Sequence, residues 1–200
     1  MTTGGIILCG GRSIRMGAPK ATLPFGPETM LQRVARLLGT VVAPIVVVAS
    51  RDQPLPDLPE GVQITHDQRE QTGPLEGLRA GLSALPESVD AAYITSCDVP
   101  LLVPGFARRM IELLGDDDIA VMEVDGFLQP LSAVYRREML PRIEELLQAD
   151  QRSPTFLCEN ARTRRVRPEE MIDIDPELRT LRNLNTPADY QQALSDAGLL

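Results

Sequence analysis

Short apolar runs typical of buried strands alternate with segments of helical periodicity along nearly the whole 200-residue chain. Because strands that alternate with helices usually form parallel sheets, this order predicts an α/β fold with helices on both faces of a mostly parallel central sheet. The chain shows no internal repeat or long linker, so we expect residues 1–200 to form a single domain. Strands are expected at 6–9, 45–49, 62–65, 91–95, 119–124, 131–135 and around 166, and helices at 28–38, 75–85, 106–114, 138–147 and 187–194.

The composition narrows the class of protein. The residues are 43% hydrophobic but only 4% aromatic, which indicates an aliphatic core, and the net charge of −8 argues against a nucleic-acid partner. No apolar run reaches the roughly 18 residues of a membrane helix and no basic segment leads a signal sequence, so we expect no membrane partner and a cytoplasmic location. Cys9, Cys97 and Cys158 form no CxxC pair, which fits a reducing compartment.

A Gly-rich segment, LCGGRSIRMGAPK, directly follows the first predicted strand at residues 8–20. The adjacent Gly10 and Gly11 allow backbone N–H groups to approach a phosphate, and Ser13 adds a hydroxyl donor. Arg15 and Lys20 add positive charge for the same oxygens. The spacing fits neither a Walker loop nor the GxGxxG dinucleotide motif. We therefore interpret it as a phosphate-binding loop of another class, with a solvated surface turn as the alternative.

A single carboxylate, Asp98, ends the fourth predicted strand in the sequence CDVP. Ligands of parallel α/β sheets bind beyond the carboxyl ends of the strands, which is where Asp98 would lie. A carboxylate is a hard oxygen ligand suited to Mg²⁺. The alternative is an Asp that only begins a turn. Beside the Gly-rich segment, we predict that Asp98 holds a Mg²⁺ that bridges it to a triphosphate.

The C-terminal segment NLNTPAD combines a helix start with two unexplained amides. Thr186 is predicted to be the N-cap of the last helix, with Pro187 at its first position and Asp189 completing a capping-box variant. The cap leaves Asn183 and Asn185 without a structural role. Near a phosphate site, these amides would position an acceptor or a metal-bound water.

Five ordered motifs together resemble the nucleotidyltransferases of the MobA family, which are similar to molybdenum cofactor guanylyltransferase. They are LCGGxSxRMGxxK, GPLxG, CDxP, QPLxAxY and NxNTPxD, and they span the chain from Ile6 to Tyr190. The resemblance implies a three-layer, Rossmann-like nucleotidyltransferase fold. It also implies an enzyme that transfers GMP from GTP to the molybdenum-pterin (molybdopterin) cofactor with Mg²⁺, forming the guanine dinucleotide cofactor and releasing pyrophosphate.

The resemblance also assigns residues and partners. It implies that Asp98 is the metal ligand and that Asp67 contacts the guanosine. With the reasoning above, the predicted catalytic residues are Lys20, Arg15 and Asp98, and the predicted acceptor residues are Asn183 and Asn185. The predicted nucleotide-binding residues are Leu8, Cys9, Gly10, Gly11, Ser13, Lys20, Asp67, Gly73, Pro74, Leu75 and Asp98. GTP and the molybdenum-pterin cofactor are the expected substrates, and acceptor molybdoenzymes or other cofactor-synthesis proteins are candidate partners.

Departures from the family pattern leave the exact function open. Cys9 stands where the family usually has Ala, Pro19 where it often has Asp, and Val48 where guanylyltransferases often have an Asn near the base. Val48 keeps open a related enzyme that uses CTP or another phosphorylated acceptor, and Ser50 is a candidate replacement. A non-catalytic nucleotide-binding regulator also stays open, as does a dinucleotide-dependent oxidoreductase, which the loop spacing disfavours. The arginines between 162 and 167 form a solvated face or attract a phosphorylated pterin or a protein partner.

Overall fold

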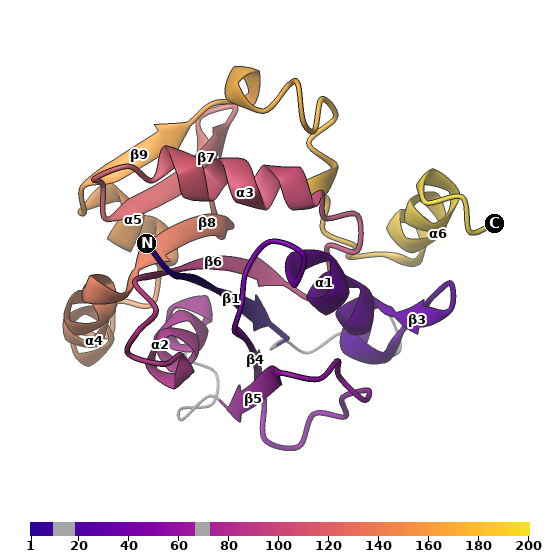
Figure 1. The fold of residues 1–200 in the computed structure, drawn as a ribbon, viewed down its shortest axis with the longest axis horizontal. Helices are drawn as coiled ribbons and strands as arrows, with labels where there is room; N and C mark the ends of the chain where they lie inside the picture. The colour runs from indigo at the N-terminus through magenta and orange to yellow at the C-terminus, as the bar shows by residue number, and fades with distance from the viewer. Residues whose placement is uncertain (10–18, 67–72) are drawn as a thin grey trace.

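The computed structural model describes residues 1–9, 19–66 and 73–200, in which seven strands form one sheet in the order β5-β4-β1-β6-β8-β7-β9 (Figure 1). Every strand of this sheet runs parallel to its neighbours except β8, which is antiparallel to β6 and β7. The strands are β1 (Thr3–Leu8), β4 (Ile45–Ala49), β5 (Val62–His66), β6 (Ala91–Ser96), β7 (Ile119–Val124), β8 (Phe127–Arg136) and β9 (Thr163–Val166). The mostly parallel α/β fold predicted from the sequence is therefore confirmed.

The helices are α1 (Met30–Leu38), α2 (Pro74–Ala84), α3 (Pro104–Leu113), α4 (Leu140–Gln148), α5 (Pro154–Glu159) and α6 (Pro187–Asp196). Short 3₁₀ turns occupy η2 (Lys20–Thr22), η3 (Arg137–Met139), η4 (Pro168–Glu170) and η5 (Arg179–Leu181), and β2 (Pro24–Phe25) pairs with β3 (Glu28–Thr29) in a small second sheet. No helix in the described part of the chain is long and apolar enough to cross a lipid bilayer.

The main differences from the sequence prediction concern the start of α1, β8 and α5. Residues 28 and 29, where the first helix was expected to begin, form β3 and pair with β2. The strand expected at 131–135 spans 127–136, because Asp125 and Gly126 both take positive φ, 50° and 80°, and form a tight hairpin turn. Helix α5 was not predicted, since six residues are too few for a helical period to be recognised. Its start is nevertheless encoded locally: the Ser153 hydroxyl accepts the N–H of Phe156, and Pro154 occupies the first helical position.

The alternation of side chains along β1 divides the core into two layers. Ile7 belongs to a cluster shared with α1 and α3, whereas Ile6 and Leu8 belong to a cluster shared with α2, α4 and α5. Each face of the sheet is thus covered by helices, as a parallel sheet that is apolar on both faces requires. Helix α2 approaches β1 so closely that a Cβ on Gly81 would lie 2.6 Å from the Ile6 side chain.

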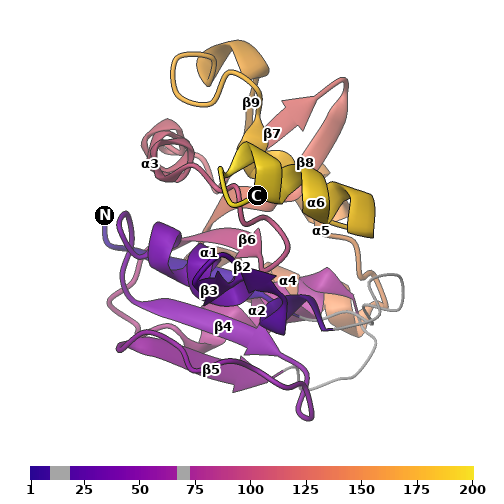
Figure 2. The same cartoon turned by 90° about the vertical axis from the view of Figure 1, so that its right-hand side faces the viewer.

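A small third cluster fixes the C-terminal helix beyond the carboxyl ends of the strands. In Figure 2, α6 lies toward the viewer, above α1 and β2. Leu184 and Leu194 pack with Phe25 and Met30, and the Tyr190 ring contacts the Phe25 ring edge-on at 6.4 Å between centroids. The Tyr190 hydroxyl donates to the carbonyl of Pro24. This packing places the segment that precedes α6 next to the end of β6.

Candidate functional site

Lys20 joins three parts of the chain that are far apart in sequence. Its Nζ lies 2.7 Å from Asp98 Oδ2 and 2.8 Å from Asn185 Oδ1. The Lys20 and Asp98 side chains are each 17% exposed, so the ion pair is partly buried but open to a ligand. Lys20 is also the only lysine among the 20 Lys and Arg residues of the sequence. A compact ammonium, rather than a planar guanidinium, therefore occupies the point where these segments meet.

Backbone hydrogen bonds hold these segments together. The Cys97 N–H donates to the Leu8 carbonyl at 3.0 Å, which joins the end of β1 to the residue before Asp98. The Leu184 N–H donates to the Asp98 carbonyl at 2.9 Å, which joins the same turn to the segment before α6. The backbone of Asp98 is consequently fixed between the end of β1 and the segment before α6, at the carboxyl edge where the sequence predicts a ligand site.

Ser96 is a polar contact of Asp98 that the sequence reasoning missed. It is the last residue of β6, and its hydroxyl donates to Asp98 Oδ1, whereas Lys20 Nζ lies 2.7 Å from Oδ2. A serine at the end of a strand, two residues before an aspartate in the following turn, is the signal that would have indicated this contact.

Gln53 is a second residue that the sequence reasoning missed. Its Nε2 donates to the Cys9 carbonyl at 2.8 Å, and its Oε1 accepts the Ser50 N–H at 3.3 Å. It therefore ties the end of β1 to the turn after β4. The side chain of Val48 is only 1% exposed and belongs to the core, so it contributes no polar group here.

The two cysteines near the site are buried thiols. Cys9 and Cys97 are 4% and 5% exposed. The hydrogen bond with Cys97 and burial together raise the pKa of the Cys9 thiol well above its usual value. Since both effects favour the protonated form, Cys9 stays uncharged at neutral pH and adds no negative charge next to Asp98.

The start of α2 lies at the same edge of the sheet. Gly73 precedes the helix with φ 82° and ψ −178°, a conformation that strains any residue with a Cβ. Pro74 follows at the first helical position and is exposed, whereas Leu75 is fully buried in the core and presents no surface to a nucleotide. Glu76 in the same turn is 2% exposed and accepts two hydrogen bonds from Arg79, at 2.8 and 2.9 Å.

Apart from Gly73, Pro74 and Leu75 at the start of α2, the predicted residues divide into three groups. Lys20, Asp98 and Asn185 are brought into direct contact, and Leu8 and Cys9 lead into that point. Asn183 is exposed on the segment that carries Asn185. Five predicted residues lie outside the described part of the chain: Gly10, Gly11, Ser13, Arg15 and Asp67.

The helix cap predicted for the last helix is confirmed, and it also holds Asn185. The Thr186 hydroxyl accepts the Asp189 N–H at 3.1 Å, and Asp189 Oδ2 accepts the N–H groups of Asn185 and Thr186 at 3.0 and 2.8 Å. The N–H donors of Asn185 and Thr186 and the Thr186 hydroxyl lower the pKa of Asp189. The cap thus fixes the backbone of Asn185 while its side chain contacts Lys20.

The donor set at this edge suits a hard cation shared with a substrate. Asp98 offers carboxylate oxygens and Asn185 an amide oxygen, both of the type that Mg²⁺ prefers. In the described residues, no group of three His, Cys, Asp or Glu side chains forms a metal cage. Mg²⁺ in nucleotide sites typically uses one or two carboxylates with phosphate oxygens and waters, so a single Asp fits this role.

The arginine-rich segment around β9 does not resemble an anion site. Arg162 contacts Asp118 at 3.3 Å, Arg165 contacts Glu123 at 3.6 Å, and Arg164 is paired with Glu170. Acidic neighbours thus balance three of its arginines, which favours the solvated-face interpretation.

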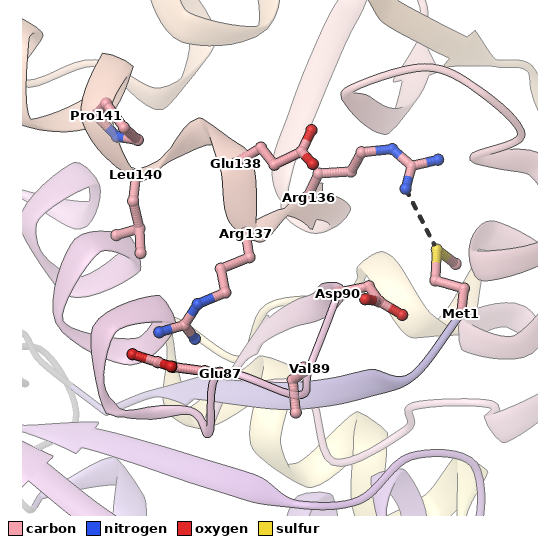
Figure 3. Close-up of a pocket in the computed structure, with 9 residues that line it drawn as sticks. All are labelled: Met1, Glu87, Val89, Asp90, Arg136, Arg137, Glu138, Leu140 and Pro141. Atoms are coloured by element: carbon pink, nitrogen blue, oxygen red, sulfur yellow. Dashed lines mark hydrogen bonds between the residues drawn. The ribbon is translucent and has the colours of Figure 1, made fainter.

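A pocket of about 490 Å³ lies at the opposite, amino edge of the sheet (Figure 3). Its lining combines acidic and basic side chains with apolar ones: Met1, Glu87, Val89, Asp90, Arg136, Arg137, Glu138, Leu140 and Pro141. Arg137 Nη1 donates to the carbonyls of Leu82 and Leu85, both at 2.9 Å. Arg137 of this pocket is therefore engaged in holding the end of α2 in place.

Comparisons with known proteins identify the family and the fold. Residues 5–164 match the family described as the MobA-like NTP transferase domain. The chain is 33% identical over 203 aligned positions to a probable molybdenum cofactor guanylyltransferase of Methanosarcina acetivorans, covering 94% of this chain and 88% of that protein. It is 34% identical to a probable molybdenum cofactor guanylyltransferase of Mycobacterium tuberculosis, covering 92% and 89%. Its fold matches the crystal structure of molybdopterin-guanine dinucleotide biosynthesis protein A from Archaeoglobus fulgidus, with a TM-score of 0.79, 18% identity and coverage of 98% and 100%.

Proposed function

Because the chain belongs to the MobA-like NTP transferase family and is a nucleotidyltransferase, we propose that it transfers GMP from GTP to the molybdenum-pterin cofactor and releases pyrophosphate. The observation that carries this proposal is the contact of Lys20 with both Asp98 and Asn185, which unites three of the five motifs at one point. The names of the relatives, which are guanylyltransferases, favour GTP over CTP.

The charge balance of the site suits this reaction. The terminal phosphate of the acceptor is already an anionic nucleophile, so the reaction needs no strong general base. The main obstacles are repulsion between the anions and negative charge that develops on the leaving pyrophosphate. Lys20 addresses both, because its ammonium can move from Asp98 to phosphate oxygens within a partly buried site where charge interactions are strong.

Asp98 and Asn185 have complementary roles in this proposal. Asp98 is the ligand that would hold Mg²⁺, whose chemistry is to neutralise phosphate charge and hold the triphosphate in line. Asn185 keeps Lys20 at the carboxyl edge of the sheet when the ammonium leaves Asp98. Arg15, Ser13 and the glycines 10 and 11 are proposed to bind the phosphates, and Asp67 the guanosine, as the family resemblance implies.

Pyrophosphate release tests the proposal directly. The protein is incubated with GTP, CTP or ATP, each with and without the molybdenum-pterin acceptor and with and without Mg²⁺. We expect release only with GTP, acceptor and Mg²⁺ together. Release with CTP in place of GTP would favour the CTP-using relative, and GTP binding without release under any condition would favour a nucleotide-binding regulator.

A further inference from the structure

The two oxygens of the Asp98 carboxylate have different neighbours. Oδ2 is 2.7 Å from Lys20 Nζ, whereas Oδ1 accepts the hydroxyl of Ser96. The backbone of Asp98 is held separately, since its carbonyl accepts the Leu184 N–H at 2.9 Å. With the backbone fixed and Oδ1 bonded, rotation of the carboxylate is the remaining freedom, and the Ser96 hydroxyl restricts it.

We infer that Ser96 is a positioning residue that orients Asp98 so that Oδ2 faces Lys20 and, when a divalent cation binds, the cation. Ser96 is well suited to this task because it is the terminal residue of β6, paired with Leu8 of β1 in the sheet. Its backbone therefore lies in a rigid element rather than in the following turn. The inference rests on the proposed function, since it explains how Asp98 is prepared for the metal.

This role follows from the geometry of hydrogen bonding. A carboxylate that loses one hydrogen-bond donor rotates more freely. Binding a cation then requires this rotation to be restricted, which weakens the binding free energy. A hydrogen bond to a charged group typically contributes enough to change an equilibrium about tenfold or more. The consequence is a weaker affinity for the divalent cation with little change in nucleotide affinity measured without the cation.

The experiment compares Ser96→Ala, Ser96→Cys and Ser96→Thr with the wild type and with Ser83→Ala, an exposed serine of α2. Free Mn²⁺ is measured by electron paramagnetic resonance during titration in the presence of a non-hydrolysable GTP analogue. We expect half-saturation to need about tenfold more Mn²⁺ in Ser96→Ala and Ser96→Cys, which corresponds to about 1.4 kcal/mol. Ser96→Thr, which keeps the hydroxyl, is expected to bind Mn²⁺ as the wild type does, and so is Ser83→Ala.

Thermal melting of each variant separates positioning from folding. If Ser96→Ala does not fold, the nearly isosteric Ser96→Cys carries the test. The inference is overturned by wild-type Mn²⁺ affinity in Ser96→Ala or Ser96→Cys, or by equal weakening in Ser96→Thr. Pyrophosphate release by the same wild-type preparation distinguishes the two proposals. If the Ser96 variants show the expected Mn²⁺ affinities but the wild type releases no pyrophosphate, the proposed function alone is overturned. If the wild type releases pyrophosphate but Ser96→Ala and Ser96→Cys bind Mn²⁺ as the wild type does, the role of Ser96 alone is overturned.

Discussion

Strand β6 carries an aspartate just outside each of its ends, and the two carboxylates have contrasting surroundings. Asp90 precedes the strand and accepts the backbone N–H of Thr2 at 2.6 Å. Asp98 follows it and contacts the side chains of Lys20 and Ser96. The same contrast applies to the cations, because Arg137 at the amino edge donates to backbone carbonyls whereas Lys20 at the carboxyl edge donates to side chains.

This difference indicates which edge can respond to a ligand. A backbone group that loses its partner remains in place and unsatisfied, so contacts with backbone groups stabilise one structure. Side chains can exchange partners, and a triphosphate offers Lys20 oxygens that compete with those of Asp98. The carboxyl edge is therefore the reactive one, and the pocket at the amino edge is a structural junction (Figure 3).

The largest expected effect comes from neutralising the carboxylate at the reactive edge. Asp98→Asn keeps the side-chain shape but removes the charge that would hold the cation, so we expect pyrophosphate release to fall by about 10³-fold. The matched control is Asp90→Asn at the other end of β6, which should keep activity within about twofold. An equal loss of pyrophosphate release in Asp98→Asn and Asp90→Asn would contradict the distinction between a reactive carboxyl edge and a structural amino edge.

Replacing the lysine gives the next largest effect. Lys20→Met should lower kcat by about 10²-fold, since a positioned charge on the transferring phosphates is lost. Lys20→Arg should recover only part of the loss, because a planar guanidinium does not replace the point charge between Asp98 and Asn185. Steady-state kinetics measures both. Full activity in Lys20→Arg would contradict the importance of the compact ammonium.

Much of this edge could be predicted from the sequence, because local patterns encode it. The apolar run before Gly10 predicted β1, the run before Asp98 predicted β6, and the TPAD segment predicted the capped start of α6. Parallel strands place their carboxyl ends together, so the sequence predicted that Lys20 and Asp98 serve the same phosphate and metal site. The ion pair between them was not part of that prediction.

The remaining parts depend on tertiary packing that a single sequence does not reveal. The bond from Lys20 to Asn185 spans 165 positions, and it exists because α6 packs on Phe25 and Met30. The contact of the Asn185 amide oxygen with Lys20 was not predicted, and the role of Asn185 at the acceptor stays a prediction. Gln53 was missed for the same reason, since its carbonyl partner, Cys9, follows β1 and is 44 positions away in the sequence.

At the amino edge, loss of an arginine should affect stability instead of catalysis. Arg137→Met removes the donor for the carbonyls of Leu82 and Leu85 at the end of α2, so we expect a loss of about 2 kcal/mol. For a chain of this size that corresponds to a melting temperature lower by roughly 4–8 °C. The control, Arg142→Met, breaks an exposed ion pair with Glu145 and should change little. A large loss of kcat in folded Arg137→Met would contradict the division between the edges.

The smallest expected effect tests a backbone contact located at the reactive edge. Thr186→Ala removes the hydroxyl that accepts the Asp189 N–H, which should cost about 1 kcal/mol of stability, as for other N-caps. If contacts with backbone groups serve stability and contacts between side chains serve function, the type of contact matters more than its position at the carboxyl edge. We then expect kcat to fall less than about threefold, because Asp189 still accepts the Asn185 N–H. Thermal melting and kinetics on the same preparation measure both quantities. A fall in kcat as large as that of Lys20→Met, with an unchanged melting temperature, would mean that Thr186 itself belongs to the reactive network and that the edge, not the contact type, determines function.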